Sequence, residues 1–271
     1  MTTGDLLRVT ADDAELAVEV RGGGSGAAPI LFIHGFPFDR SMWRHQLATL
    51  PRWRRIAPDL RGAGASSAPA RGYSMARYAA DLVRVLDVLE LRQAVMCGLS
   101  MGGYILFELL RRHPELVRAA VFCNTKAEAD SADAKRGRDE MAALAEREGA
   151  AAVADRLLPR LLAPATFATQ PEVEAQVRAM IMGTPVPGLV GALLAMRDRP
   201  DSTATLGAIH VPVLVVAGGD DPIAPPAGMR AMAQAIAGAQ FVRIPAAAHL
   251  TPLEQPRAMS RALGDFLAGL G

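Results

Sequence analysis

The stretch VMCGLSMGGY, residues 95–104, places Ser100 inside a Gly-x-Ser-x-Gly pattern. The pattern alone is weak evidence, because glycine and serine are common residues. It becomes informative when a strand precedes the serine and a helix follows it, since that arrangement exposes a nucleophile on a sharp turn. The flanking sequence meets this condition: QAVMCG (93–98) is typical of a buried strand, and SMGGYILFELLRR (100–112) is typical of a helix.

Glycines surround this serine at the positions where a sharp turn requires small residues. A strained turn brings the backbone two residues before and two residues after the serine close together. Gly98, Gly102 and Gly103 fit that requirement. A helix beginning at Ser100 also directs its free N–H groups toward negative charge that develops there. We therefore expect Ser100 to be a nucleophile.

Strand and helix patterns alternate on both sides of the motif. Strands are expected over 14–20, 30–35, the start of 54–67, 93–98, 117–125, 211–221 and 240–245, and helices over 41–49, 74–89, 100–112, 226–237 and 256–270. Ser74 is placed to cap the helix that follows it. Such alternation predicts an α/β fold with a mostly parallel sheet covered by helices on both faces.

Residues 126–205 interrupt the alternation with helical patterns and no convincing strand. Prolines at 159, 164, 171, 185 and 187 are expected to separate the helices of this segment. We interpret the segment as a helical cap of about four helices, inserted between two strands. The predicted division is a core of residues 1–125 and 206–271 and a cap of residues 126–205.

The composition limits the classes of partner. The chain has 271 residues and a formal net charge of +1, and its lysines and arginines are mixed with acids, so a nucleic-acid partner is not expected. We see no signal peptide and no apolar run long enough to cross a membrane, which predicts a cytoplasmic protein without a membrane partner. A small-molecule partner is expected, and a homo-oligomer is compatible with the sequence. Cys97 and Cys123 are expected to be reduced core residues without a metal.

A serine nucleophile needs a base, and five histidines are available. His45, His113 and His210 lie in or beside helices or before a strand, where structural roles suffice. His249 lies in the loop between the last strand and the last helix. The order of serine, acid and histidine along the chain then matches an established arrangement of catalytic residues, which favours His249.

The acid that orients the histidine is expected at the end of VLVVAGGDD. Asp220 and Asp221 cannot both fill that role, and we favour Asp221, whereas Asp220 is expected to cap the next helix. The other strand end that could supply an acid holds Asn124, which carries no charge.

Two backbone N–H groups are expected to hold the oxyanion that forms when the serine attacks a carbonyl. One is the N–H of Met101, directly after the nucleophile. The other is the N–H of Phe36 in HGFPFD (34–39), where Gly35 lets the loop approach the site. His34 is then expected to brace this loop rather than to take part in catalysis.

With these residues in place, the sequence resembles the α/β-hydrolase fold superfamily. The matching stretches are HGFPFDRSMW, APDLRGAGASS, GLSMGG, VVAGGDDPIAPP and AAAHLTPLEQP, and the match covers nearly all of residues 14–271. The resemblance implies an eight-stranded sheet. Within the superfamily the chain looks like small bacterial esterases, which include 3-oxoadipate enol-lactonases and cofactor-free haloperoxidases (perhydrolases). One departure is Ala248, where the family often has glycine before the histidine.

The resemblance implies hydrolysis of small to medium carboxylic esters or lactones through an acyl-serine intermediate, with no metal and no cofactor. Perhydrolysis and C–C bond hydrolysis stay open as alternatives, and a non-catalytic small-molecule receptor is the third. Members that open epoxides or remove halides carry an Asp nucleophile, which Ser100 replaces here.

The substrate pocket is expected between the cap and the carboxyl edge of the sheet. Its expected lining includes Phe36, Phe38, Leu99, Met101, Met180, Met182 and Met196, although core packing explains the cap methionines equally well. A substrate with a carboxylate would require a buried arginine, for which the cap offers Arg136, Arg138, Arg156, Arg160 and Arg178.

Overall fold

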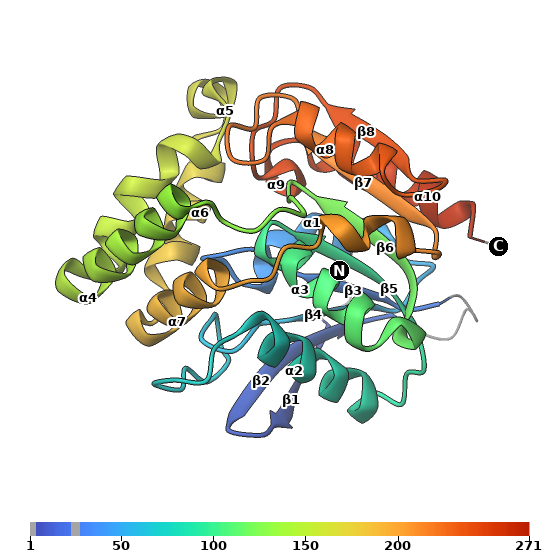
Figure 1. Cartoon of the computed structure of the whole chain (residues 1–271), viewed down its shortest axis with the longest axis horizontal. Helices are drawn as coiled ribbons and strands as arrows, with labels where there is room; N and C mark the ends of the chain where they lie inside the picture. Colours follow the sequence, from blue (N-terminus) through green and yellow to red (C-terminus); the bar gives the residue numbers. More distant parts are fainter. Residues whose placement is uncertain (1–3, 23–27, 271) are drawn as a thin grey trace.

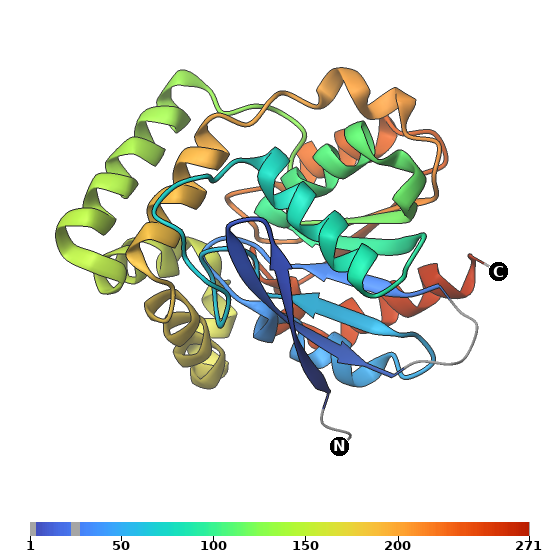
Figure 2. The ribbon, with the colours of Figure 1, turned by 90° about the horizontal axis from the view of Figure 1, so that it is seen from below.

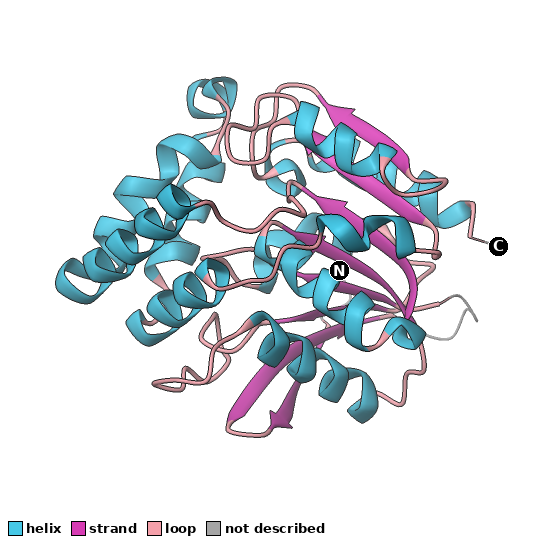
Figure 3. Cartoon of the chain, in the orientation of Figure 1, coloured by secondary structure: helices cyan, strands magenta, loops and turns pink. Residues whose placement is uncertain are grey.

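The computed structural model describes residues 4–22 and 28–270. Eight strands form one sheet in the order β1-β2-β4-β3-β5-β6-β7-β8, with helices on either side (Figures 1 and 3). The strands are β1 (Asp5–Ala11), β2 (Ala14–Arg21), β3 (Ile30–Ile33), β4 (Arg55–Pro58), β5 (Ala94–Leu99), β6 (Val117–Cys123), β7 (Val213–Gly218) and β8 (Gln240–Ile244). The predicted α/β fold is thereby confirmed.

The sheet is mostly parallel. The pairs β1–β2 and β2–β4 are antiparallel. The pairs β4–β3, β3–β5, β5–β6, β6–β7 and β7–β8 are parallel. β3, β4, β5 and β7 are buried along their whole length, as expected for strands covered on both faces. The sequence pattern did not predict β1, because only Val9 and Ala11 of its seven residues are buried.

Helices cover both faces of this sheet. The core helices are α1 (Arg44–Thr49), α2 (Met75–Val88), α3 (Met101–Arg112), α8 (Pro226–Gln234), α9 (Thr251–Glu254) and α10 (Pro256–Ala268), with short 3₁₀ segments at Arg40–Trp43, Pro114–Leu116 and Thr203–Ala208. Figure 2 shows α2 and α3 together on one face and α1 with α10 on the other. Ser74 caps α2 as predicted, since its side chain accepts a hydrogen bond from the Arg77 N–H.

The interior between sheet and helices is apolar. Cys97 and Cys123 are free and buried on neighbouring strands, with their Sγ atoms 3.8 Å apart. Phe107 of α3 stacks on Phe122 of β6 at 4.5 Å between ring centroids. Such packing fixes α3 against the middle of the sheet, and α3 begins directly after the serine of the motif.

Four helices lie between β6 and β7 and form what we call the helical insertion: α4 (Ala132–Leu161), α5 (Pro164–Thr169), α6 (Pro171–Met182) and α7 (Val186–Arg197). They stand together at one end of the sheet (Figure 1). Pro164 and Pro171 begin helices, as expected, but Pro159 lies inside α4 and does not separate two helices. The chain breaks instead at Gly149, whose φ of +79° favours glycine.

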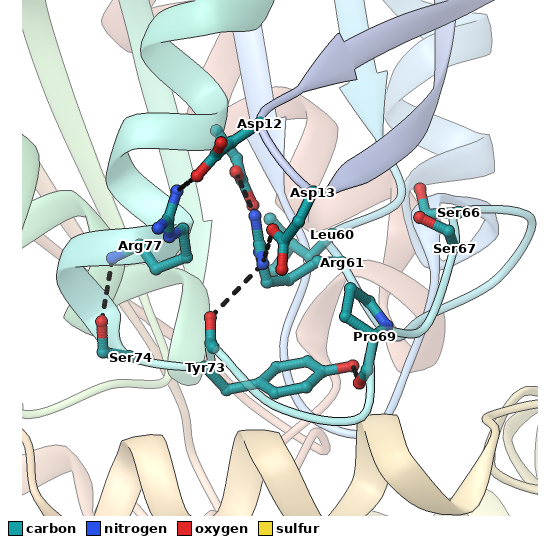
Figure 4. Close-up of polar contacts among 12 residues, drawn as sticks. Asp12, Asp13, Leu60, Arg61, Ser66, Ser67, Pro69, Tyr73, Ser74 and Arg77 are labelled. Carbon is teal, nitrogen blue, oxygen red and sulfur yellow. Dashed lines mark hydrogen bonds and ion pairs between the residues drawn. The ribbon is translucent and has the colours of Figure 1, made fainter.

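The loop after β4 packs against the helical insertion. A Cβ on Gly188 of α7 would overlap the carbonyl of Gly62, and one on Gly191 would overlap the ring of Tyr73. The Tyr73 hydroxyl donates to the Pro69 carbonyl at 2.8 Å (Figure 4). Buried Arg61 braces the same loop through ion pairs with Asp81 and Asp13. The glycines therefore let α7 pack directly on this loop.

Among the described residues no single helix has the length and apolar composition to cross a membrane, and α6 and α7 meet these criteria only jointly, across a bend of 94°.

Candidate active site

Ser100 occupies a strained turn between β5 and α3. Its φ is +52° and its ψ is −111°, a region that residues other than glycine rarely adopt. Its N–H donates to the Cys123 carbonyl at 2.9 Å, and its carbonyl accepts from the Gly103 N–H at 2.9 Å and from Thr125 Oγ1 at 2.8 Å. These contacts hold a backbone conformation that costs about 1–3 kcal/mol.

The glycines around Ser100 are required by close backbone contacts. A Cβ on Gly98 would overlap the backbone of Gly102, and a Cβ on Gly102 would overlap the carbonyl of Ile33. A Cβ on Gly103 would lie only 2.5 Å from Thr125 Oγ1. The turn can therefore form only because these positions lack side chains, as the sequence predicted.

Asp221 and His249 form a buried hydrogen-bonded pair. His249 Nδ1 lies 2.8 Å from Asp221 Oδ2, and the other carboxylate oxygen accepts from the N–H groups of Ile223 at 2.8 Å and Ala224 at 3.1 Å. Burial would raise the pKa of Asp221, but the His249 ring, the Asn124 amide and the Ala224 N–H outweigh burial and lower that pKa below 3.8. The carboxylate is therefore held in its charged form.

Asp220 does not cap α8, contrary to the expectation from sequence. The residue before α8 is Pro225, no acidic residue lies in the first turn, and Asp220 is exposed to solvent. The carboxylate that accepts the backbone N–H groups after β7 belongs to Asp221. The adjacent acids thus differ because only the second one turns inward toward His249.

Asn124 is a residue of this site that the sequence did not predict. Its Nδ2 donates to Asp221 Oδ2 and to the Ala248 carbonyl, both at 2.9 Å, and its Oδ1 accepts from Thr251 Oγ1 at 2.8 Å. Its φ of +45° is tolerated by asparagine better than by most residues. The available signal in the sequence is an asparagine at the carboxyl end of a buried strand, where the ends of parallel strands bring side chains together.

Neighbouring strand ends bring these residues to one edge of the sheet. Ser100 follows β5, Asn124 follows β6, Asp221 follows β7 and His249 follows β8, and these four strands are adjacent and parallel. Within the described residues no hydrogen bond joins Ser100 Oγ to the His249 ring. The link between serine and base therefore stays a prediction, and such hydrogen bonds often tighten only when substrate binds.

The loop at residues 34–39 lies against the serine. A Cβ on Gly35 would lie 3.1 Å from the Leu99 carbonyl and 3.4 Å from Ser100 Cβ. In the part of the chain that the structure describes, the backbone N–H groups of Phe36 and Met101 donate to no acceptor. Two buried residues beside Ser100 thus carry unpaired donors.

His34 braces this loop, as expected. Its Nε2 accepts from the Leu60 N–H at 2.9 Å and its Nδ1 donates to the Gly35 carbonyl at 2.8 Å. Burial lowers the pKa of His34, which favours the neutral ring that these two contacts require. His34 therefore joins the loops after β3 and β4.

A small cavity of about 10 Å³ lies beside the loop. Its lining includes Phe36, Phe38, Met101, Thr184, Gly188 and Ala192. Leu99 is buried next to Gly35, and Met180 and Met196 are buried in the helical insertion. Met182 is 53% exposed at the end of α6 and is not among the residues that line this cavity. The structure therefore does not bring Met182 to the predicted pocket, because its side chain leaves the insertion on the solvent side.

A positive cluster lies between the helical insertion and α3. Asp130 pairs with Arg199 at 2.8 Å and Arg138 at 3.1 Å, and Lys126 Nζ lies 4.0 Å away. Burial would raise the pKa of Asp130, but Arg138 and Arg199 lower it. Three cations thus share one carboxylate. Of the predicted arginines only Arg138 joins this cluster. Arg136, Arg156 and Arg160 are exposed, and half-buried Arg178 pairs instead with Asp155 at 2.7 Å.

Among the described residues no group of three or more histidine, cysteine, aspartate or glutamate side chains is arranged to hold a metal ion.

Comparison with known proteins agrees with this geometry. Residues 28–256 match the alpha/beta hydrolase fold family. The chain is 39% identical to a thermophilic esterase from Thermogutta terrifontis, solved with malate bound, at a TM-score of 0.94 over 98% of this chain and 99% of that one. It is 33% identical to the enol-lactonase from Burkholderia xenovorans LB400, at a TM-score of 0.90 over 97% and 100%. It is 28% identical to 3-oxoadipate enol-lactonase 2 of Acinetobacter baylyi over 94% of both chains.

Proposed function

The chain belongs to the α/β hydrolase fold family and is a hydrolase, and from this premise we propose that it cleaves small to medium carboxylic esters or lactones through an acyl-serine intermediate. The observation that carries the proposal is Ser100 on its strained turn after β5, at the same edge of the sheet as the hydrogen-bonded Asp221–His249 pair, which follows β7 and β8. This arrangement combines a presented nucleophile with a base of fixed orientation.

In the proposed first step, His249 Nε2 takes the proton of Ser100 as Oγ attacks the carbonyl carbon of the substrate. Asp221 holds the ring by its Nδ1 and stabilises the imidazolium that forms. The unpaired N–H groups of Phe36 and Met101 donate hydrogen bonds to the carbonyl oxygen and stabilise the negative charge that forms on it. The imidazolium then protonates the leaving alkoxide, and the ester bond breaks to leave the acyl-serine.

In the second step, His249 takes a proton from water, which attacks the acyl carbonyl while the same two N–H groups hold the oxyanion. Return of the proton to Ser100 releases the carboxylic acid. Every group that this cycle uses is a side chain or backbone group of this chain, acting on a small molecule. A cytoplasmic location stays a prediction from the composition.

We propose that the helical insertion is a cap that limits the acyl group. Thr184, Gly188 and Ala192 of the insertion line the cavity beside Phe36. The space that these residues leave, about 10 Å³, holds about one water molecule, so a bound acyl group must displace them, which favours short acyl chains.

Substrates with a free carboxylate are a second candidate class, favoured by the positive cluster. Lys126 follows Thr125, whose hydroxyl contacts the Ser100 carbonyl, and the Arg199 guanidinium lies 4.1 Å from the ring centre of Tyr104, one turn after Ser100. Lys126→Gln should raise KM for p-nitrophenyl hydrogen succinate while leaving KM for p-nitrophenyl acetate unchanged. Equal KM values for both esters in wild type and variant would remove this class.

The covalent step is tested by mass spectrometry after treatment with a fluorophosphonate. The proposal predicts one adduct per chain, located on the peptide that contains Ser100 and absent in Ser100→Ala. Absence of labelling in the folded wild-type protein would contradict the serine mechanism and would favour a receptor. Bromination of monochlorodimedone in acetate and hydrogen peroxide, measured in parallel, reports perhydrolysis of the same acyl-enzyme.

A further inference from the structure

We propose that Glu254 is a positioning residue that couples the helical insertion to the loop of His249, so that the insertion helps to set the position of the catalytic base. The inference rests on the proposed function, because it takes His249 as the base. Glu254 is the last residue of α9 and is 2% exposed.

One carboxylate oxygen of Glu254 holds the backbone on both sides of the histidine. Oε1 accepts from the Ala248 N–H at 2.9 Å and from the Leu250 N–H at 3.1 Å. These are the residues directly before and after His249. The position of the imidazole along the loop is therefore fixed by a side chain five residues later.

The other oxygen holds the junction between α4 and α5 of the insertion. Oε2 accepts from the Ala163 N–H at 2.7 Å and from Thr166 Oγ1 at 2.7 Å. The same junction contacts His249 directly, because the Leu161 carbonyl accepts the His249 N–H at 3.1 Å. Insertion and histidine loop are thus joined by one carboxylate and one backbone hydrogen bond.

The chemistry of the four partners favours the ionised form of Glu254. All four act as donors here, and an ionised carboxylate offers two acceptor oxygens, whereas a protonated carboxyl would turn an O–H toward one of the donors. Among the described residues no lysine, arginine or histidine forms an ion pair with it. Burial raises the pKa of Glu254, and the four donors oppose that rise. The charge is therefore retained in the interior by neutral donors alone, which makes the site intolerant of a lost acceptor.

Displacement of the α4–α5 junction must then either move the backbone around His249 or break hydrogen bonds to a buried charge. We expect the second outcome to be rare, because such groups are costly to leave unpaired. The insertion would thereby influence the chemical step and not only the fit of the acyl group.

The test compares three variants. Glu254→Gln keeps the shape but turns an amide N–H₂ toward two donors. Thr166→Val removes only the hydroxyl of the insertion and keeps both bonds from Oε1 to the histidine loop. Glu108→Gln is the matched control, because Glu108 is 3% exposed and pairs with Arg111 and Arg112 far along α3 from Ser100.

Coupling predicts that kcat for p-nitrophenyl acetate falls about tenfold or more in Glu254→Gln and about two- to fivefold in Thr166→Val, with KM changed less than twofold. The rate of acylation by the fluorophosphonate should fall in parallel. Glu108→Gln should lower Tm and keep the wild-type kcat. A folded Thr166→Val with wild-type kcat and acylation rate would overturn the proposal.

Hydrogen exchange separates this proposal from the proposed function. Coupling predicts faster amide exchange in residues 246–252 when Thr166 is changed, although the hydroxyl of Thr166 donates to Glu254 and not to that segment. This readout needs no substrate, so an inactive wild-type protein would contradict the function and leave the coupling testable. Exchange that accelerates only near residue 166 would overturn the coupling even in an active enzyme.

Discussion

Asn124 Nδ2 lies 2.9 Å from Asp221 Oδ2, the same oxygen that lies 2.8 Å from His249 Nδ1. The acid of the proposed triad therefore accepts two side-chain hydrogen bonds on one oxygen and two backbone N–H groups on the other. Asn124 also accepts from Thr251, the first residue of α9, so it joins the segments that follow β6, β7 and β8. Its role is to orient the acid, and this role suggests the first prediction.

Asn124→Asp should lower kcat/KM by about tenfold to a hundredfold, because a donor to Asp221 is replaced by a second carboxylate and the repulsion raises the pKa of the pair. Aspartate has the same size as asparagine, and it also tolerates the positive φ of this position. On the acid side of the pH profile of kcat/KM, the variant should lose activity at a higher pH than the wild-type protein does. Asp220→Asn, at an exposed carboxylate, is the control, and an unchanged profile in Asn124→Asp would refute the assigned role.

Stability in acid should depend on Asp221. Its pKa in the folded protein lies below 3.8, so near that pH the folded state binds fewer protons than the unfolded chain. The stabilising contribution is present above about pH 5 and is lost as the pH falls through the lowered pKa. Urea unfolding of Asp221→Asn between pH 6 and pH 3.5 should therefore show a weaker pH dependence than wild type. Parallel curves for the two proteins would count against this prediction.

Gly102→Ala should destabilise the protein by about 1–3 kcal/mol and should reduce turnover, because the added methyl overlaps the Ile33 carbonyl and forces the turn at Ser100 to shift. Gly137→Ala is the matched control. Gly137 lies in α4 with no atom within 4 Å of an added Cβ, so alanine should stabilise that helix by up to about 1 kcal/mol. Thermal unfolding and ester hydrolysis measured on both variants check the pair. Equal stability of the two variants would be the contrary result.

Local sequence patterns were sufficient for the alternating core and for the strand ends that carry Ser100, Asp221 and His249. Apolar runs bounded by glycine or acids identify buried strands, because strands covered on both faces have no polar side. β1 (Asp5–Ala11) lacks such a run, since most of it is exposed, and only the family resemblance implied an eighth strand.

Contacts between distant segments could not be predicted in the same way. Asn124 is hydrogen-bonded to Asp221, which lies 97 residues away, and Glu254 is hydrogen-bonded to Ala163, which lies 91 residues away. Nothing in the neighbouring sequence distinguishes these two residues from ordinary polar residues. The side on which Met182 leaves α6 depends on how the helix packs. Tertiary contacts, rather than local preference, decided these features. The break in α4 at Gly149 is different, because glycine tolerates the positive φ found there.

The most direct test of the account is the hydrolysis of p-nitrophenyl esters from acetate to octanoate by wild type and by Ser100→Ala in parallel. The account predicts turnover that is greatest for the short chains and that falls to the background rate in the variant, while circular dichroism and Tm stay near the wild-type values. Near-normal turnover in a folded Ser100→Ala would contradict the assignment of Ser100 as the nucleophile.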